Sequence, residues 1–100
     1  MSLLCLDVGN RLSVIGVWDV RADEPVLAGR WTVSSDATRT ADEWYLLAHG
    51  FVRAAGLADD EVSAVSMCCT VPSIGVEMRA MLQRYFDHVP AVSYTHMTLP

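Results

Sequence analysis

Residues 3–18 read LLCLDVGNRLSVIGVW, and this stretch decides the fold. It holds two short apolar runs, residues 3–8 and 12–18, and the second run is rich in the β-branched and aromatic side chains that favour strands. Gly9 and Asn10 separate the runs, and this pair is typical of a tight turn. The stretch therefore predicts two strands joined as a hairpin.

The next segments extend this pattern. Residues 19–25 are polar, which predicts a loop, and residues 26–33 alternate loosely around Trp31, which predicts a third strand. After Thr40 the hydrophobic period becomes that of a helix, with apolar residues at steps of three and four from Trp44 to Ala55. Thr40 and Glu43 have the spacing of a capping box, and Gly56 is placed to end the helix.

The second half of the chain alternates strands and helices. Residues 62–71 are apolar and predict a fourth strand, Pro72 suits the first turn of a second helix that continues to Tyr85, and residues 90–92 begin a fifth strand. The order βββαβαβ predicts an α/β fold, a mixed sheet with helices packed on it. This order is similar to the ribonuclease-H-like lobe of the actin and hexokinase type of ATPase, a likeness of topology that carries no function alone.

Composition limits the classes of function. The 100 residues are 52% hydrophobic and 19% charged, as expected for one folded domain. The formal charge is −5 and the basic residues are scattered, so nucleic acid is not an expected partner. No apolar run approaches the roughly 20 residues of a bilayer span, so no membrane contact is expected. Cys5, Cys68 and Cys69 lie in apolar runs, which predicts buried thiols in a reducing cytosol.

The turn after the first strand is the candidate binding site. A turn leaves backbone amides without ladder partners, and a glycine lets a phosphate oxygen approach the main chain. Asn10 and Ser13 add side-chain donors, and Asp7 can hold a hydrated magnesium ion, which usually takes one or two carboxylates. The alternative is an ordinary hairpin in which Gly9 and Asn10 only supply positive φ and Asp7 caps amides. Spacing alone favours this alternative.

Four separated stretches, in order across residues 3–92, resemble type III pantothenate kinases. The opening LCLDVGNRLSVIG of residues 4–16 is similar to the first strand pair of that family, whose turn usually reads Asp-Val-Gly-Asn-Thr-x-Thr. The other matching stretches are WTVSSDATRTADE at 31–43, CCTVPS at 68–73, and residues 84–86 with 90–92.

The resemblance implies which residues bind the nucleotide. The ATP phosphate-binding turn would comprise Asp7, Val8, Gly9, Asn10, Arg11, Leu12, Ser13 and Val14. Asp7 would lie near the metal, and Ser13 would replace the second threonine of the family. Arg11 stands where the family has its first threonine, so it either binds phosphate as a substitute or blocks the turn.

The resemblance also implies an activity. The expected function is a cytoplasmic kinase that uses ATP and Mg²⁺ to phosphorylate pantothenate, the first step of coenzyme A synthesis, as a homodimer with a K⁺ or NH₄⁺ site. The family's catalytic aspartate lies in a Gly-x-Asp-Arg stretch, and residues 93–100 do not match what precedes it. Residues 1–92 are therefore expected to be an incomplete N-terminal ATPase-like lobe without a catalytic residue, and residues 93–100 a non-matching, foreign or frame-shifted tail. Negligible kinase activity is expected from these residues alone.

Two other functions stay open. One is a non-catalytic regulator, because the same family includes transcriptional accessory members and Arg11-Leu12 departs from the usual turn. The other is a different sugar- or acid-kinase relative that shares only the phosphate turn, which residues 39–43 and 70–73 disfavour. His49, on the polar side of its predicted helix, and His88, in a loop, are expected to be solvated and to have no catalytic role.

Overall fold

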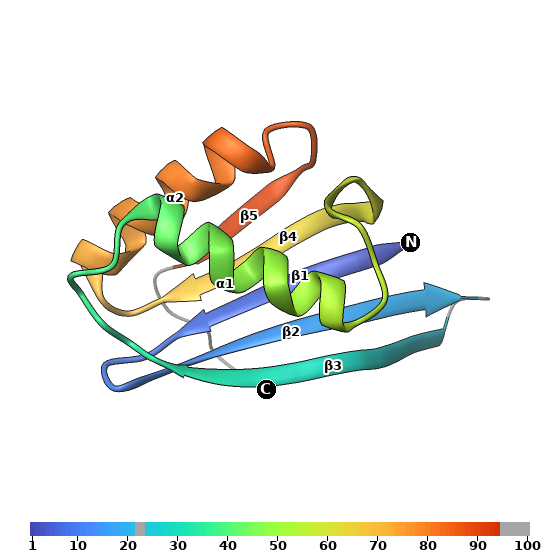
Figure 1. The fold of residues 1–100 in the computed structure, drawn as a ribbon, viewed down its shortest axis with the longest axis horizontal. Helices are drawn as coiled ribbons and strands as arrows, with labels where there is room; N and C mark the ends of the chain where they lie inside the picture. Colours follow the sequence, from blue (N-terminus) through green and yellow to red (C-terminus); the bar gives the residue numbers. More distant parts are fainter. Residues whose placement is uncertain (22–23, 95–100) are drawn as a thin grey trace.

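A single sheet with two helices on one of its faces makes up the fold (Figure 1). The computed structural model describes residues 1–21 and 24–94. The elements are β1 (Ser2–Val8), β2 (Leu12–Arg21), β3 (Glu24–Ser34), α1 (Ala41–Ala54), the short 3-10 helix η1 (Asp59–Glu61), β4 (Val62–Cys69), α2 (Pro72–Tyr85) and β5 (Ala91–Tyr94). The predicted order βββαβαβ is confirmed.

The strands lie side by side in the order β3-β2-β1-β4-β5. β1 pairs antiparallel with β2 and β2 antiparallel with β3, whereas β1 pairs parallel with β4 and β4 parallel with β5. A parallel pair needs a crossover connection, and α1 and α2 supply the two crossovers. As a result β1 and β4 end at the same edge of the sheet, next to the β1–β2 turn and the start of α2.

The loop predicted for residues 19–25 is wrong for most of its length. β2 continues to Arg21 and β3 begins at Glu24, so that Asp19 pairs with Val26 and Val20 pairs with Pro25. Polar residues can complete a strand where a neighbouring strand supplies ladder partners. Pro25 is tolerated because β3 lies at the edge of the described sheet. Residues 22 and 23 of that predicted loop lie outside the described residues.

The hydrophobic core lies between the sheet and the two helices. Leu4, Leu6 and Val8 of β1 are at most 2% exposed and face the helices, so Leu3, Cys5 and Asp7 face the other side of the sheet. The largest fully buried side chains are Trp44 of α1 and Phe86 after α2. They are joined by buried residues from every layer: Ile15, Val17, Val52, Met67, Ile74, Met78 and Met81.

Local capping places the ends of the helices as predicted. Thr40 Oγ1 accepts from the Glu43 amide at 3.3 Å, and the Glu43 carboxylate accepts from the Thr40 amide at 3.0 Å, which completes the capping box. Gly56, with φ +85°, follows the last turn of α1. Pro72 is the first residue of α2. The two helices are joined by stacked Tyr45 and Tyr85 rings whose centroids are 3.8 Å apart.

The β3 side of the core is closed by aromatic packing. The Trp31 ring stacks on Phe51 of α1 with centroids 4.9 Å apart. The ring also covers Gly29, where an added methyl group would overlap it. A glycine is therefore needed at position 29 for close approach.

Three further expectations concern cysteines, the membrane and the tail. Cys68 and Cys69 are buried as predicted, while Cys5 is half-buried and burial raises its pKa. Among the described residues no helix is both long enough and apolar enough to cross a membrane. Ser93 and Tyr94 continue β5 beside β4, and residues 95–100 of the predicted tail lie outside the described residues.

Candidate functional site

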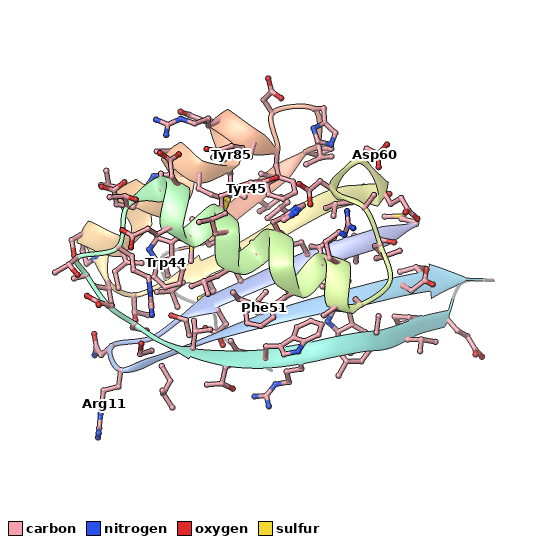
Figure 2. The ribbon with its side chains drawn as sticks, in the orientation of Figure 1. Arg11, Trp44, Tyr45, Phe51, Asp60 and Tyr85 are labelled. Carbon is pink, nitrogen blue, oxygen red and sulfur yellow. The ribbon has the colours of Figure 1, made fainter. Side chains whose placement is uncertain are left out.

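The predicted turn lies at the surface, at the end of the sheet where the C-terminal end of β1 lies. Val8 and Ser13 form the last pair of the β1–β2 ladder, and the Gly9 amide donates to the Leu12 carbonyl at 3.1 Å to close the turn. Asn10 and Arg11 are exposed. Figure 2 shows the Arg11 side chain pointing away from the sheet.

Two backbone amides of this turn are available to a ligand. Within residues 1–21 and 24–94, neither the Asn10 amide nor the Arg11 amide donates a hydrogen bond. Adjacent free N–H groups in a turn form a concavity suited to anions. The turn can therefore accept a phosphate oxygen without breaking an existing backbone bond.

Gly9 is needed for space and not for an unusual backbone angle. Gly56 is the one described glycine with positive φ, so Gly9 does not supply the positive φ that the ordinary-hairpin alternative gave to Gly9 and Asn10. A methyl group on Gly9 would lie 3.0 Å from the Leu12 carbonyl oxygen, which is tighter than an ordinary contact. A side chain at this position would thus press on the bond that closes the turn.

Asp7 is the acidic group nearest to the turn along β1. Its side chain is exposed on the sheet face opposite the helices, with Val14 and Cys68 as its ladder neighbours. A single exposed carboxylate beside free amides suits Mg²⁺, which keeps several waters and takes few protein ligands. No cluster of three or more His, Cys, Asp or Glu side chains that could hold a metal occurs in the part of the chain that the structure describes.

The remaining predicted site residues do not share one environment. Val8 is buried in the core, Val14 is half-buried, and Leu12 is 59% exposed. Ser13 is completely buried, and its hydroxyl lies 2.6 Å from the Ser35 hydroxyl. The structure therefore brings Asp7 and residues 9–11 together at the surface, whereas Ser13 lies beneath them. A direct contact between Ser13 and phosphate stays a prediction.

The loop after β3, which was not predicted to belong to the site, makes hydrogen bonds that support the turn. The Ser35 amide donates to the Arg11 carbonyl at 2.8 Å. The Arg39 guanidinium donates to the Ser34 carbonyl and, at 3.1 Å, to the Ser34 hydroxyl, and it lies over the Trp44 ring. In the sequence, Arg39 belongs to a stretch that resembles the family, but the capping box of Thr40 and Glu43 is the structural role predicted there.

The prediction that His49 is solvated holds only in part: its side chain is 38% exposed, but it also has side-chain partners. His49 Nδ1 lies 2.9 Å from a carboxylate oxygen of Asp59 and 3.3 Å from the Tyr45 hydroxyl. Asp59 belongs to η1, beyond the end of the helix, so helical periodicity could not reveal this partner. The cluster lies far from the turn, since Figure 2 places Asp60 of η1 at the opposite end of the fold from Arg11. His88 is exposed, as predicted.

We expect Tyr45 to lose its proton unusually late in an alkaline titration. Its hydroxyl donates to the Asp59 carboxylate at 2.5 Å, which with burial and the charge of Asp59 raises the pKa of Tyr45 from 10.0 to about 12. Because the folded pKa is the higher one, this contribution to stability is complete below pH 10.0 and is lost as the pH rises towards about 12.

Tyrosinate absorbance against pH checks this expectation. The variant Y45F should remove the step near pH 12. Tyr85, whose pKa is raised by its hydrogen bond to Asp42, should still titrate in this variant. A single transition near pH 10.0 in the native chain would contradict the hydrogen bond to Asp59.

Comparison with known proteins places this geometry in a family. The family model described as "Type III pantothenate kinase" matches residues 3–99. The chain is 40% identical over 90 residues to a type III pantothenate kinase of Thermobifida fusca, covering 90% of this chain and 33% of the relative. It is 38% identical over 94 residues to one of Streptomyces coelicolor, covering 90% of this chain and 34% of the relative. The chain thus spans about a third of the length of these relatives.

Solved structures confirm the predicted fold class. A ROK hexokinase from Thermus thermophilus matches with a TM-score of 0.64 at 17% identity, over 93% of this chain and 34% of that one. The Thermus thermophilus RuvC structure matches with a TM-score of 0.59 at 22% identity, over 94% of this chain and 63% of that one. The fold is therefore the ribonuclease-H-like α/β fold shared by the hexokinase type of ATPase lobe.

Proposed function

The chain belongs to the type III pantothenate kinase family, and from that premise we propose that residues 7–14 hold the phosphates of ATP. One observation carries this proposal. At the surface the β1–β2 turn offers the amides of Asn10 and Arg11, which have no partner among the described residues, and the exposed Asp7 carboxylate lies close by, near the end of β1. Backbone N–H groups in a turn that have no other acceptor can donate hydrogen bonds to the oxygens of an anion.

Each group of the turn has a distinct part in this proposal. The Asn10 and Arg11 amides donate to phosphate oxygens, and Gly9 keeps the approach to the main chain open. Asp7 would hold Mg²⁺, which when bound neutralises charge on the phosphates. The guanidinium of Arg11 replaces the hydroxyl of the family threonine, because its forked donors match phosphate oxygens.

We extend the proposal to the longer protein by family membership. Its acceptor is pantothenate, its reaction is the first step of coenzyme A synthesis, and it works in the cytoplasm as a homodimer with a K⁺ or NH₄⁺ site, without nucleic acid or membrane. None of the 100 residues matches the Gly-x-Asp-Arg stretch of the family. We therefore propose that these residues alone turn over no pantothenate, since base and acceptor site must both be positioned. Formation of phosphopantothenate by the purified chain would contradict this.

A second candidate function is favoured by one residue. Arg11 stands in place of a threonine in the phosphate turn, which supports a regulatory member of the family that has lost nucleotide binding. The two candidates differ in whether the turn binds ATP.

Titration of the ¹⁵N-labelled chain with ATP, with and without Mg²⁺, tests the proposal. We expect saturable, magnesium-dependent shifts of the Asn10 and Arg11 amide resonances, because those amides would gain an acceptor. Adenosine serves as the control, since it lacks phosphates and should leave these two resonances in place. If ATP with Mg²⁺ shifts neither resonance, the phosphate-binding role fails and the regulatory candidate gains support.

A further inference from the structure

The β1–β2 turn has little support of its own. One internal hydrogen bond, from the Gly9 amide to the Leu12 carbonyl, closes it, and Asn10 and Arg11 are exposed. Ordering one residue costs about 1–2 kcal/mol of conformational entropy. A turn that must present its amides at fixed angles binds more tightly if that order exists before the ligand arrives. The support must therefore come from outside the turn.

Ser35, the residue directly after β3, contacts the turn at two points. Its amide donates to the Arg11 carbonyl at 2.8 Å, and its hydroxyl lies 2.6 Å from the Ser13 hydroxyl. Ser13 has no exposed surface, so Ser35 is the partner that satisfies a buried hydroxyl. Holding the Arg11 carbonyl also holds the planar peptide unit that joins Arg11 to Leu12.

Arg39 holds Ser35 in place through a shared peptide unit. The Ser34 carbonyl, which accepts from the Arg39 guanidinium, and the Ser35 amide, which donates to Arg11, belong to the same planar peptide. The guanidinium also donates to the Ser34 hydroxyl at 3.1 Å. A rotation of this peptide would break contacts on both of its sides.

The Arg39 guanidinium is itself placed by the core. It lies 5.1 Å from the centroid of the Trp44 ring, a distance at which a cation is attracted to an aromatic face. Trp44 is 1% exposed and therefore held by packing. A continuous set of contacts thus runs from the core through Arg39 and the Ser34–Ser35 peptide to the turn.

We propose that Arg39, Ser35 and Ser13 form a brace that positions the β1–β2 turn for phosphate binding. This inference rests on the function proposed above. The three residues are positioning residues, because each acts on the ligand through the backbone of residues 9–12. The proposal also gives Arg39 a role. Arg39 takes no part in the helix cap, which Thr40 and Glu43 form.

Paired variants that differ by few atoms test the brace. S35A removes the hydroxyl, and S35T keeps a hydroxyl at the same place. R39K keeps the charge but loses the forked donors and the flat face that stacks on Trp44. The matched controls lie away from the turn. S63A removes a hydroxyl that accepts from the Ser2 amide at the start of β1, and R53K lies in the last turn of α1.

Two measurements report on positioning, and melting temperature reports on stability. The first is the NMR order parameter of the Asn10 and Arg11 amides without nucleotide, which follows fast local motion. The second is the Kd for ATP with Mg²⁺. We expect S35A and R39K to lower the order parameters and to raise the Kd about tenfold, equivalent to about 1.4 kcal/mol. S35T, S63A and R53K should match the native chain in both.

The possible outcomes separate the brace from the nucleotide function. A native chain that fails to bind ATP refutes the proposed function, and the order parameters still decide the brace. A second outcome is that S35A and R39K lower the melting temperature but leave the order parameters and the Kd equal to those of the native chain. That result would show that Ser35 and Arg39 only stabilise the fold. Lower order parameters with a native Kd would refute the positioning role.

Discussion

Replacing Asp7 by asparagine is expected to raise the Kd for ATP about tenfold to a hundredfold in the presence of Mg²⁺. The substitution keeps the size of the side chain but removes the charge that would hold the metal. Hydrogen bonds and contacts of charged groups contribute about 1.5–3 kcal/mol, and each 1.4 kcal/mol is a factor of ten. Because the Asp7 side chain is exposed, the melting temperature should stay within the range of ordinary surface substitutions.

A matched control separates the local effect from a change in net charge. D60N removes the same charge from an exposed residue at the opposite end of the fold, as Figure 2 shows. Titration calorimetry with ATP, with Mg²⁺ present and absent, should show an effect of D7N that depends on Mg²⁺ and little effect of D60N. Equal Kd values for D7N and the native chain would remove Asp7 from the site and leave the turn amides as the phosphate ligands.

Replacing Trp44 by alanine is expected to cause the largest loss of stability from a single change in the chain. Trp44 is 1% exposed, and truncation of a buried Trp costs about 3–5 kcal/mol. The free energy of unfolding of a domain of this size is about 5–15 kcal/mol, so about a fifth or more of it would be lost. Within the described residues the indole Nε1 has no hydrogen-bond partner, so the loss is one of packing and of the contact with Arg39.

Urea unfolding of W44A beside L46A checks this expectation. Leu46 lies two residues away on the same helix and is 66% exposed, so its truncation should change the unfolding free energy by less than about 0.5 kcal/mol. Similar midpoints for the two variants would show that the core does not depend on Trp44. A partially destabilised W44A would also be expected to lose order at Asn10 and Arg11 if the brace is anchored on the ring.

The two experiments address different parts of one arrangement. Asp7 lies near the end of β1, on the sheet face opposite the helices, and the Trp44 side chain of α1 lies in the core. The Ser34–Ser35 peptide and Arg39 connect the core to the turn between them. Binding and stability should therefore separate in D7N and change together in W44A.

The sequence by itself determined the order of the strands and α-helices and the surface turn between β1 and β2. These features depend on neighbours within a few residues: apolar spacing distinguishes strand from helix, and Thr40 with Glu43 and Gly56 mark the ends of α1. The likeness of residues 4–16 and 31–43 to the family likewise required no knowledge of contacts.

Only the tertiary structure decided which distant groups meet. Ser13 and Ser35 are 22 positions apart and bond because β2 and β3 pair with Leu12 opposite Ser34. His49 meets Asp59 because the chain turns back after α1. The same pairing extends β2 and β3 through residues that read as a loop. Strand register depends on all the residues of two strands and on the layer packed against them, so local patterns carry too little information to specify it.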